Sequence, residues 1–390
     1  MKKRILTAIL VGFFAFIGCF TPLVGITKVS ADTSDAIPID MYLLGGQSNA
    51  VGCSEIGYSP TKTYENIWYA GEIERAVKLK NSGTENEEAG EPEYEITAAQ
   101  SWVESFSDFK LYVSAGMGYH SSSIGPEYGM AKIFNNQYEG EERRAIIFKT
   151  AYGGSFLHDV ATSANWASPS TWREGYKPDP DKPVSTFNRT GLLYQRFIDN
   201  FERVYNELKA NGYQPIVKGM AWMQGEADAG DSTAKMFYFN NLKAFIQDIR
   251  IDIAKITGDE KMNEMPFVIG KIAKTFMKYN NPDTTAINEV QQVVADQMEN
   301  VYAIDTDDLI LVRADGKING SGGWDTCHYN FKDMVKLGER FAETFNEVDA
   351  KNGKSGCAST INAFPQVIIV SLFSVMLLCV VGKYRREANN

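Results

Sequence analysis

The chain has 390 residues, of which 44% are hydrophobic and 23% are charged. This composition is that of a globular protein, and it excludes collagen-like, coiled-coil and wholly disordered chains. The net charge is −10, but residues 1–31 carry +4 and residues 383–390 carry +2, so the segment between them carries −16. Because so acidic a body repels nucleic-acid phosphates, we expect no nucleic-acid partner.

The first 31 residues have the pattern of a secretory signal peptide. Lys2, Lys3 and Arg4 precede a long apolar run, and the small residues Ser30 and Ala31 end the segment. This order predicts cleavage after Ala31. An uncleaved membrane anchor, or a lipoprotein site at Cys19, is the alternative interpretation.

Residues 32–346 are predicted to form one domain in which apolar strands alternate with amphipathic helices. The predicted strands are 39–44, 144–151, 215–223, 267–273 and 301–305. The predicted helices are 191–208, 236–256, 287–298 and 331–345. Such alternation predicts a parallel sheet covered on both faces, with the ligand site beyond the carboxyl ends of the strands. A polar insertion at about 54–143 is predicted to contain surface loops and short strands.

Polar and glycine-rich residues directly follow three of these strands. Ser48, after the first strand, could be a nucleophile on a sharp strand-to-helix turn or simply a helix N-cap. Gly153 and Gly154 follow the second strand, and Gln224 follows the third. The Ser48 N–H, one of these glycine N–H groups and the Gln224 amide could together donate to an oxyanion.

A serine nucleophile needs a base, and the chain has three histidines, His120, His158 and His328. Asp325 lies three residues before His328 and could orient its imidazole. By spacing alone, this pair could equally be a surface ion pair. Asp159 adjoins His158, which gives that histidine a less apt carboxylate.

The C-terminus is predicted to anchor the protein in a membrane. A stalk at 347–365 leads to an apolar segment at 366–382 that is close to the length of a spanning helix, and the tail 383–390 is basic. A buried core helix is the alternative interpretation. The signal and anchor together predict a catalytic domain outside the cell, in a pattern typical of Gram-positive surface proteins.

Five short blocks resemble, in order, those of SGNH-type hydrolases, and in particular the sialate O-acetylesterase and carbohydrate esterase family 6 branch. They span about 40–345 and are Gly46-Gln47-Ser48-Asn49, Gly125-Pro126-Glu127, Gly153-Gly154-Ser155, Trp222-Met223-Gln224-Gly225-Glu226 and Asp325-Thr326-Cys327-His328.

The resemblance implies a three-layer α/β/α sandwich, here with a central parallel five-stranded sheet. It also implies a hydrolase that removes acetyl esters from sugars such as sialic acid, xylan or another glycan. Ser48 would be the nucleophile, His328 the base and Asp325 its orienting carboxylate. Gln224 stands where other SGNH hydrolases keep an oxyanion asparagine, and either Gly153 or Gly154 would supply another donor. No metal or cofactor is expected.

Five residues of these blocks and their neighbours are candidates for substrate binding: Gln47, Asn49, Glu226, Tyr152 and Trp324. The role of Glu226 could instead be structural. Tyr152 and Trp324 are the first candidates for sugar stacking, ahead of Trp102, Tyr119, Trp166 and Trp172.

If the triad closes, Cys53 and Cys327 could approach each other and form a disulfide between the two catalytic loops. Two other functions stay open. A lipid or thioester hydrolase would have apolar loops beside the site, whereas these loops are polar and aromatic. A glycan-binding surface protein on a degenerate hydrolase fold would not need a complete set of Ser48, Asp325 and His328.

Overall fold

The computed structural model describes residues 36–56, 61–71, 77–79, 94–96, 112–119, 123–141, 144–160, 164–172, 190–274, 283–311 and 327–357. The chain divides into two units, Met1–Ala36 and Ile37–Asn390, and every described helix and strand lies in the second. The predicted signal peptide and the predicted membrane segment both fall outside the described residues.

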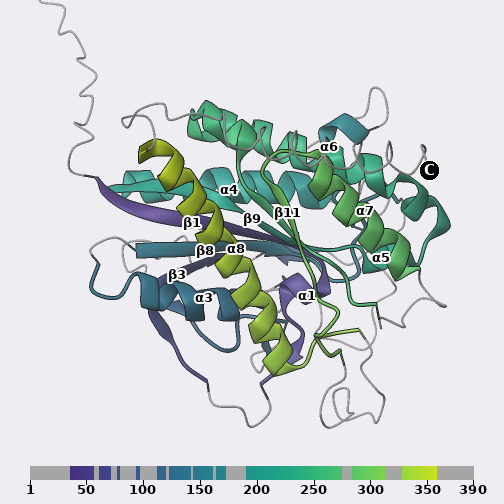
Figure 1. Cartoon of the computed structure of the whole chain (residues 1–390), viewed down its shortest axis with the longest axis horizontal. Helices are drawn as coiled ribbons and strands as arrows, with labels where there is room; N and C mark the ends of the chain where they lie inside the picture. Colours follow the sequence, from purple (N-terminus) through teal and green to yellow (C-terminus); the bar gives the residue numbers. More distant parts are fainter. Residues whose placement is uncertain are drawn as a thin grey trace, which may run out of the picture. The chain divides into compact units, whose positions relative to one another are not determined.

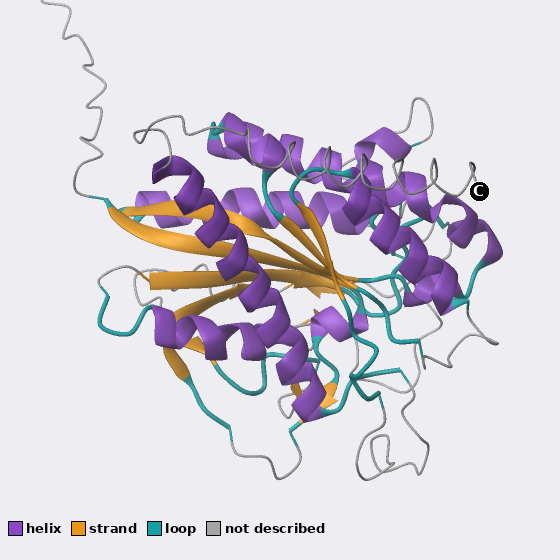
Figure 2. Cartoon of the chain, in the orientation of Figure 1, coloured by secondary structure: helices purple, strands orange, loops and turns teal. Residues whose placement is uncertain are grey.

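A central sheet runs through this unit (Figures 1 and 2). Among the described residues it has seven strands in the order β11-β10-β9-β1-β8-β3-β6, all parallel except β6. Their bounds are β1 Ile37–Gly46, β3 Tyr64–Gly71, β6 Tyr112–Val113, β8 Arg144–Ala151, β9 Tyr213–Met223, β10 Phe267–Gly270 and β11 Val301–Ile304. The five predicted strands are confirmed.

The prediction of a five-stranded, wholly parallel sheet is wrong, because the polar insertion contributes β3 and β6. β3 has a short apolar run at 67–70, but Glu65 and Asn66 interrupt its buried positions and the surrounding insertion is polar, and β6 has only two residues. The insertion also holds the short pairs β2 (Ser54–Glu55) with β7 (Ser123–Ile124) and β4 (Val77–Leu79) with β5 (Tyr94–Ile96). The prediction of short strands there is confirmed.

Helices pack against both faces of the sheet, as the alternating pattern predicted (Figure 2). α3 (Pro126–Gln137) and α8 (Phe331–Cys357) cover one face, and α4 (Leu192–Ala210) and α6 (Ser232–Thr257) cover the other. α7 (Thr284–Gln297) packs against α6 and β11, and the short elements are α1 (Ser48–Val51), α5 (Glu226–Ala229), η4 (Pro169–Thr171) and η5 (Glu260–Glu264). The four predicted helices are confirmed as α4, α6, α7 and α8. α3 was not predicted, because it lies inside the polar insertion.

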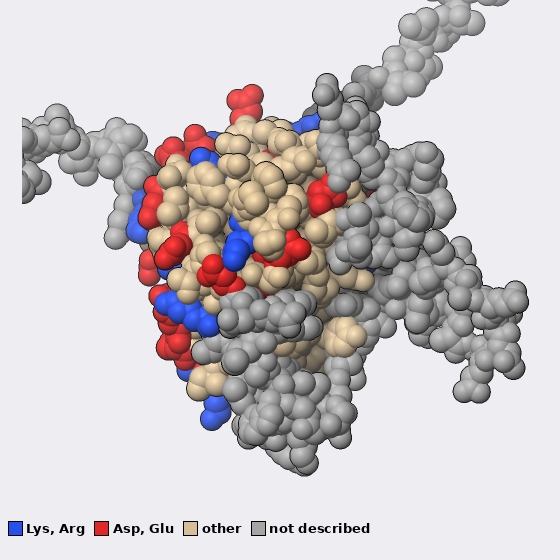
Figure 3. Space-filling view, turned by 90° about the vertical axis from the view of Figure 1, so that its right-hand side faces the viewer, with Lys and Arg blue, Asp and Glu red and all other residues tan. Residues whose placement is uncertain are grey.

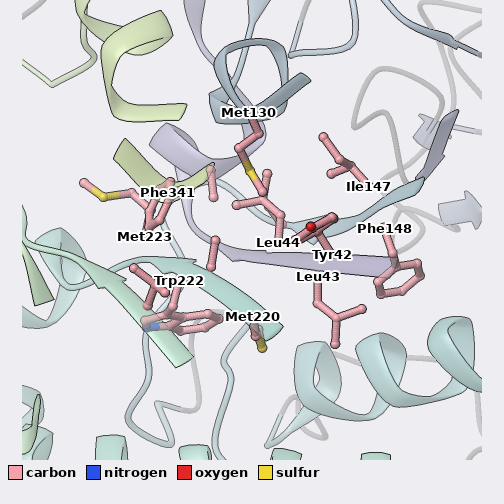
Figure 4. Packing of buried hydrophobic residues seen from close by; sticks show 14 of the residues in the cluster. Tyr42, Leu43, Leu44, Met130, Ile147, Phe148, Met220, Trp222, Met223 and Phe341 are labelled. Atoms are coloured by element: carbon pink, nitrogen blue, oxygen red, sulfur yellow. The ribbon is translucent and has the colours of Figure 1, made fainter. Parts of the chain in front are cut away.

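The core lies between the sheet and these helices, and alternate residues of each strand serve its two halves. Tyr42 stacks on Phe134 of α3 with ring centroids 4.0 Å apart, whereas Leu43 points to the opposite face of β1 (Figure 4). On that opposite side, Phe148 packs edge-on against Phe197 of α4, at 5.3 Å between ring centroids. This burial on both faces explains why the central strands read as continuous apolar runs.

Helix α8 continues to Cys357, past position 346 where the domain was predicted to end, so the first part of the predicted stalk is helical. Within the described residues, no helix is both long and apolar enough to span a bilayer.

Candidate active site

The register of the central strands brings three of the motif blocks to one edge of the sheet. Gly46, the last residue of β1, pairs with Ala151 at the end of β8 and with Met223 at the end of β9. The Gln47 N–H donates to the Met223 carbonyl at 2.9 Å, and the Tyr152 N–H donates to the Gly46 carbonyl at 3.0 Å. The residues that follow β1, β8 and β9 therefore begin side by side.

Ser48 begins the four-residue helix α1 immediately after β1 and is partly exposed, whereas Asn49, Ala50 and Val51 are buried. The turn before it requires glycine. Gly46 has a φ of 140°, and a Cβ at this position would lie 2.0 Å from the Met223 carbonyl oxygen. The chain thus turns sharply at the carboxyl edge and leaves the Ser48 side chain partly accessible.

Asn49 joins the Ser48 helix to the segment that contains His328. Its amide nitrogen donates to the Cys327 carbonyl at 3.1 Å, and its amide oxygen accepts from the Tyr329 N–H at 3.3 Å. These two partners flank His328, which is half-buried. The fold therefore brings together Ser48 and His328, which are 280 positions apart in the chain, through bonds made by their immediate neighbours.

Glu226 is buried below this junction. Its Oε1 accepts from the Asn49 amide at 2.9 Å, which uses the second hydrogen of that nitrogen. Burial raises the pKa of Glu226, while the Asn49 hydrogen bond and the nearby charge of His328 act in the opposite direction. Among the described residues, its Oε2 has no hydrogen-bond partner.

Gln47 fastens the same region to the start of α5. Its side-chain oxygen accepts from the Ala227 N–H at 3.2 Å and lies 3.5 Å from the Gly225 nitrogen. Gln47, Asn49 and Glu226 are each at most 2% exposed. In this structure, these three candidates for substrate binding contact protein groups rather than solvent.

Asp228 organises the loop after β8, and the sequence analysis did not single it out. Its carboxylate accepts from the Leu157 N–H at 2.9 Å, the His158 N–H at 3.2 Å and the Gln224 amide at 2.6 Å. Burial raises the pKa of Asp228 to about 6, although these three donors lower it. The sequence signal was weak, since an acidic residue in a short helix usually faces solvent.

Gln224 is completely buried, and both hydrogens of its amide are used inside the protein. One is donated to Asp228 and the other to the Ser155 carbonyl at 3.1 Å. Tyr238 of α6 donates to the Gln224 carbonyl at 3.0 Å. Gln224 therefore holds the Gly153-Gly154-Ser155 loop in place.

The two glycines of that loop are partly exposed at the sheet edge, and Tyr152 beside them is half-buried. Ser155 donates to the Tyr152 carbonyl at 2.7 Å and accepts from the Trp166 indole at 2.9 Å. Trp166 is fully buried, which corrects its place among the exposed stacking candidates: it fills the core next to Trp222.

The structure corrects the disulfide hypothesis, because no disulfide joins Cys53 and Cys327. Their chain segments do lie together, since Ser54 donates to the Tyr329 carbonyl at 2.5 Å. Successive residues of an extended chain point to opposite sides, and Ser54, not Cys53, takes the side that faces residues 327–329. Asp325, Trp324, Trp102 and His120 lie outside the described residues.

Glu127 of the Gly125-Pro126-Glu127 block forms a buried ion pair next to α1 with Lys149, a residue that the sequence analysis missed. Lys149 of β8 is buried, lies 2.9 Å from Glu127 Oε2, and donates to the carbonyls of Val51 and Met117 at 2.9 and 3.0 Å. Val51 is the last residue of α1. The only sequence signal for this contact was a lysine inside an apolar strand.

On the face that Figure 3 shows, charged side chains of both signs lie beside an area of uncharged side chains. Within the described ranges, no group of three or more His, Cys, Asp or Glu side chains could hold a metal ion.

Comparisons with known proteins give the fold and the family of this chain. NanS shares the fold, with a TM-score of 0.53 at 13% identity over 82% of this chain and 99% of its own. An Arabidopsis thaliana protein scores 0.47 at 18% identity, covering 80% of this chain and 98% of its own. A carbohydrate acetylesterase from Xanthomonas citri scores 0.39 at 16% identity, covering 78% and 55% of the two chains. A search of curated protein sequences found no match.

The family described as "Carbohydrate esterase, sialic acid-specific acetylesterase" matches residues 38–347, the segment that holds the motif blocks and all of the sheet and helices except Ile37 and the last ten residues of α8. This protein therefore belongs to the sialic acid-specific acetylesterase (SASA) family of carbohydrate esterases, which are hydrolases that act on ester bonds.

Proposed function

We propose that this protein is a serine esterase that removes O-acetyl groups from a carbohydrate, either sialic acid, acetylated xylan or another glycan, through an acetyl-Ser48 intermediate. The observation that carries the proposal is the Asn49 bridge. It fixes both neighbours of His328 to the residue that follows Ser48. A nucleophile and a base need such mutual positioning within hydrogen-bond reach of each other.

The reaction proceeds in two steps of acyl transfer. His328 accepts the proton of the Ser48 hydroxyl as its oxygen attacks the acetyl carbonyl, and then returns that proton to the departing sugar oxygen. In the second step His328 takes a proton from water, whose oxygen attacks the acetyl-serine. Acetate leaves as Ser48 regains its proton. Asp325 orients His328 and stabilises the imidazolium.

The Ser48 N–H and the N–H of Gly153 or Gly154 donate to the oxyanion of each tetrahedral intermediate. Gln224, the third predicted donor, supports this hole by holding the glycine loop, and would donate directly only by giving up Ser155 or Asp228. We assign Gln47, Asn49 and Glu226 to positioning α1, α5 and His328. Tyr152 and Trp324 are assigned to contact with the sugar.

Acetate release tests the proposal. The substrates are O-acetylated sialic acid and acetylated xylan, assayed side by side with the wild-type chain and Ser48→Ala. We expect release from one of them, and a loss of at least about 1000-fold in kcat for Ser48→Ala because the nucleophile is gone. The matched control is Ser114→Ala, which changes a half-buried serine next to β6 at the far side of the sheet.

Near-wild-type turnover by Ser48→Ala would refute the mechanism. Labelling of Ser48 by a fluorophosphonate without acetate release would favour a lipid or thioester hydrolase. No labelling of a folded protein would favour a glycan-binding surface protein.

For the whole chain we propose secretion through the signal peptide 1–31 and anchoring through 366–382, with the catalytic domain outside the cell. The support is the sequence pattern of basic and apolar residues at the two ends.

A further inference from the structure

Two apolar side chains are exposed on the first turns of α6, beside the candidate active site. Phe237 is 42% exposed and Met236 is 71% exposed. The imidazole of His158 lies parallel to the Phe237 ring, with an interplanar angle of 8° and 5.2 Å between ring centroids. Parallel rings at this separation are offset, so part of each ring face is left uncovered. The part of the Phe237 ring that His158 leaves uncovered is thus a flat, partly accessible surface, with the His158 ring stacked beside it.

The His158 ring is held in a defined orientation. Its backbone N–H donates to Asp228, and its Nδ1 lies 3.1 Å from the Asn241 side-chain nitrogen. This contact fixes the plane of the imidazole, whichever tautomer the ring adopts. A flat surface that is ordered before binding loses little conformational entropy when a ligand stacks on it.

This surface adjoins the site through bonds that have already been described. His158 lies four residues after Gly154 in the segment that follows β8, and Phe237 lies in the helix that follows α5. Asp228 of α5 joins the two segments, since it binds both the His158 N–H and the Gln224 amide. Hydrogen bonds therefore join the segments that carry the flat surface and the glycine N–H groups.

We propose that His158 and Phe237 form a platform on which a pyranose ring of the acetylated glycan stacks, with Asn241 orienting His158. The apolar C–H face of a pyranose is complementary to an aromatic ring face, and a half-exposed phenylalanine has no core-packing reason to be aromatic. The inference rests on the esterase function proposed above and adds a specificity determinant to it.

The test compares Phe237→Ala with its neighbour Met236→Ala, which removes exposed apolar surface but no ring. Each is assayed on the acetylated glycan that the wild-type chain hydrolyses and on 4-nitrophenyl acetate, which carries the same acetyl group without a sugar. For Phe237→Ala we expect KM for the glycan to rise roughly 5- to 10-fold, with a much smaller change in kcat. Phe237→Tyr, which keeps a flat ring, restores the KM, and Met236→Ala leaves it unchanged.

An unchanged KM for the glycan in Phe237→Ala would refute the stacking platform, and so would an equal rise in KM for 4-nitrophenyl acetate. Neither result would contradict the esterase function. Calorimetric binding of the glycan to Ser48→Ala and to the double variant Ser48→Ala/Phe237→Ala tests the platform without turnover. The double variant is expected to bind more weakly by the same factor, and equal affinities refute the proposal. Wild-type inactivity on both esters refutes the esterase instead.

Discussion

Asp228 shows how a single buried carboxyl group can hold an active-site loop. It accepts three hydrogen bonds, two of them from the backbone of residues 157 and 158, and it has no cation partner among the described residues. Such a carboxylate must offset its loss of hydration with hydrogen bonds alone. The raised pKa of Asp228, about 6, indicates that they do so only in part.

This pKa predicts a distinct pH dependence of stability. Because burial raises the pKa of Asp228 from 3.8 to about 6, the folded state binds its proton more tightly than the unfolded state does. The resulting stabilisation is complete below the unfolded pKa and is lost as the pH rises through 6. Relative to Asp228→Asn, the free energy of unfolding of the wild-type chain should fall by about 2 kcal/mol between roughly pH 4 and pH 7.

Urea unfolding at a series of pH values measures this difference. The control is Asp283→Asn, because the Ala286 N–H lowers the pKa of Asp283, with Lys235 as a further cause. Wild-type stability relative to that variant should change in the opposite direction, with a gain as the pH rises. A flat difference for Asp228→Asn would show that this carboxyl keeps its ordinary pKa in the fold.

At the scale of elements, α1 depends on contacts from strands and helices on both sides. Lys149 of β8 binds the last carbonyl of α1 and pairs with Glu127 of α3, and both charges are buried. Helices α3 and α8 cross at close range where each has a glycine. A Cβ at Gly129 would lie 2.0 Å from the Val335 carbonyl oxygen, and one at Gly338 would lie 2.1 Å from the Pro126 carbonyl oxygen. The element that carries Ser48 is therefore held by the packing of α3, α8 and β8.

We expect Lys149→Met to lower the free energy of unfolding by about 3–5 kcal/mol, because it leaves the Glu127 charge buried without its opposite charge, with only the Gly125 N–H still donating to it. The exposed pair Lys132–Glu339 provides the matched control, and Lys132→Met should cost less than about 1 kcal/mol. Urea unfolding measures both values. The double variant Lys149→Met/Glu127→Gln should recover part of the loss, and a cost for Lys149→Met no larger than that of the control would contradict this account.

At the scale of the whole molecule, every described helix and strand lies between Ile37 and Cys357. The two predicted targeting segments lie beyond these limits, and they are separate in composition from the acidic body. Folding and membrane attachment are thus expected to be independent properties of the chain.

A chain truncated after Cys357 should therefore unfold at the same urea concentration as the full chain and hydrolyse 4-nitrophenyl acetate at the same rate. In the native host, the full chain should sediment with membranes, and the truncated chain should appear in the medium. Recovery of both chains in the medium would refute the proposed membrane anchor. A lower stability of the truncated chain would show that residues after 357 belong to the fold.

Five parallel strands, four long helices and three motif blocks at strand ends could be predicted from the amino-acid sequence. These features depend on local periodicity and on the residues that can make a sharp turn, such as Gly46. The esterase family was likewise evident from short blocks around Ser48, Gln224 and His328, which the family match over 38–347 confirms.

The other features could not be predicted, because they depend on contacts between polar groups that are far apart in the chain and that folding brings together. The Lys149–Glu127 pair and the loop contacts of Asp228 have no local pattern, since burial by distant segments creates them. Strand β3 has only a short apolar run, and its place in the sheet depends on its pairing with β8. The same reason explains Gln47, Asn49 and Glu226: their residue types suited substrate binding, but their burial directs every hydrogen bond they make among the described residues to the protein itself.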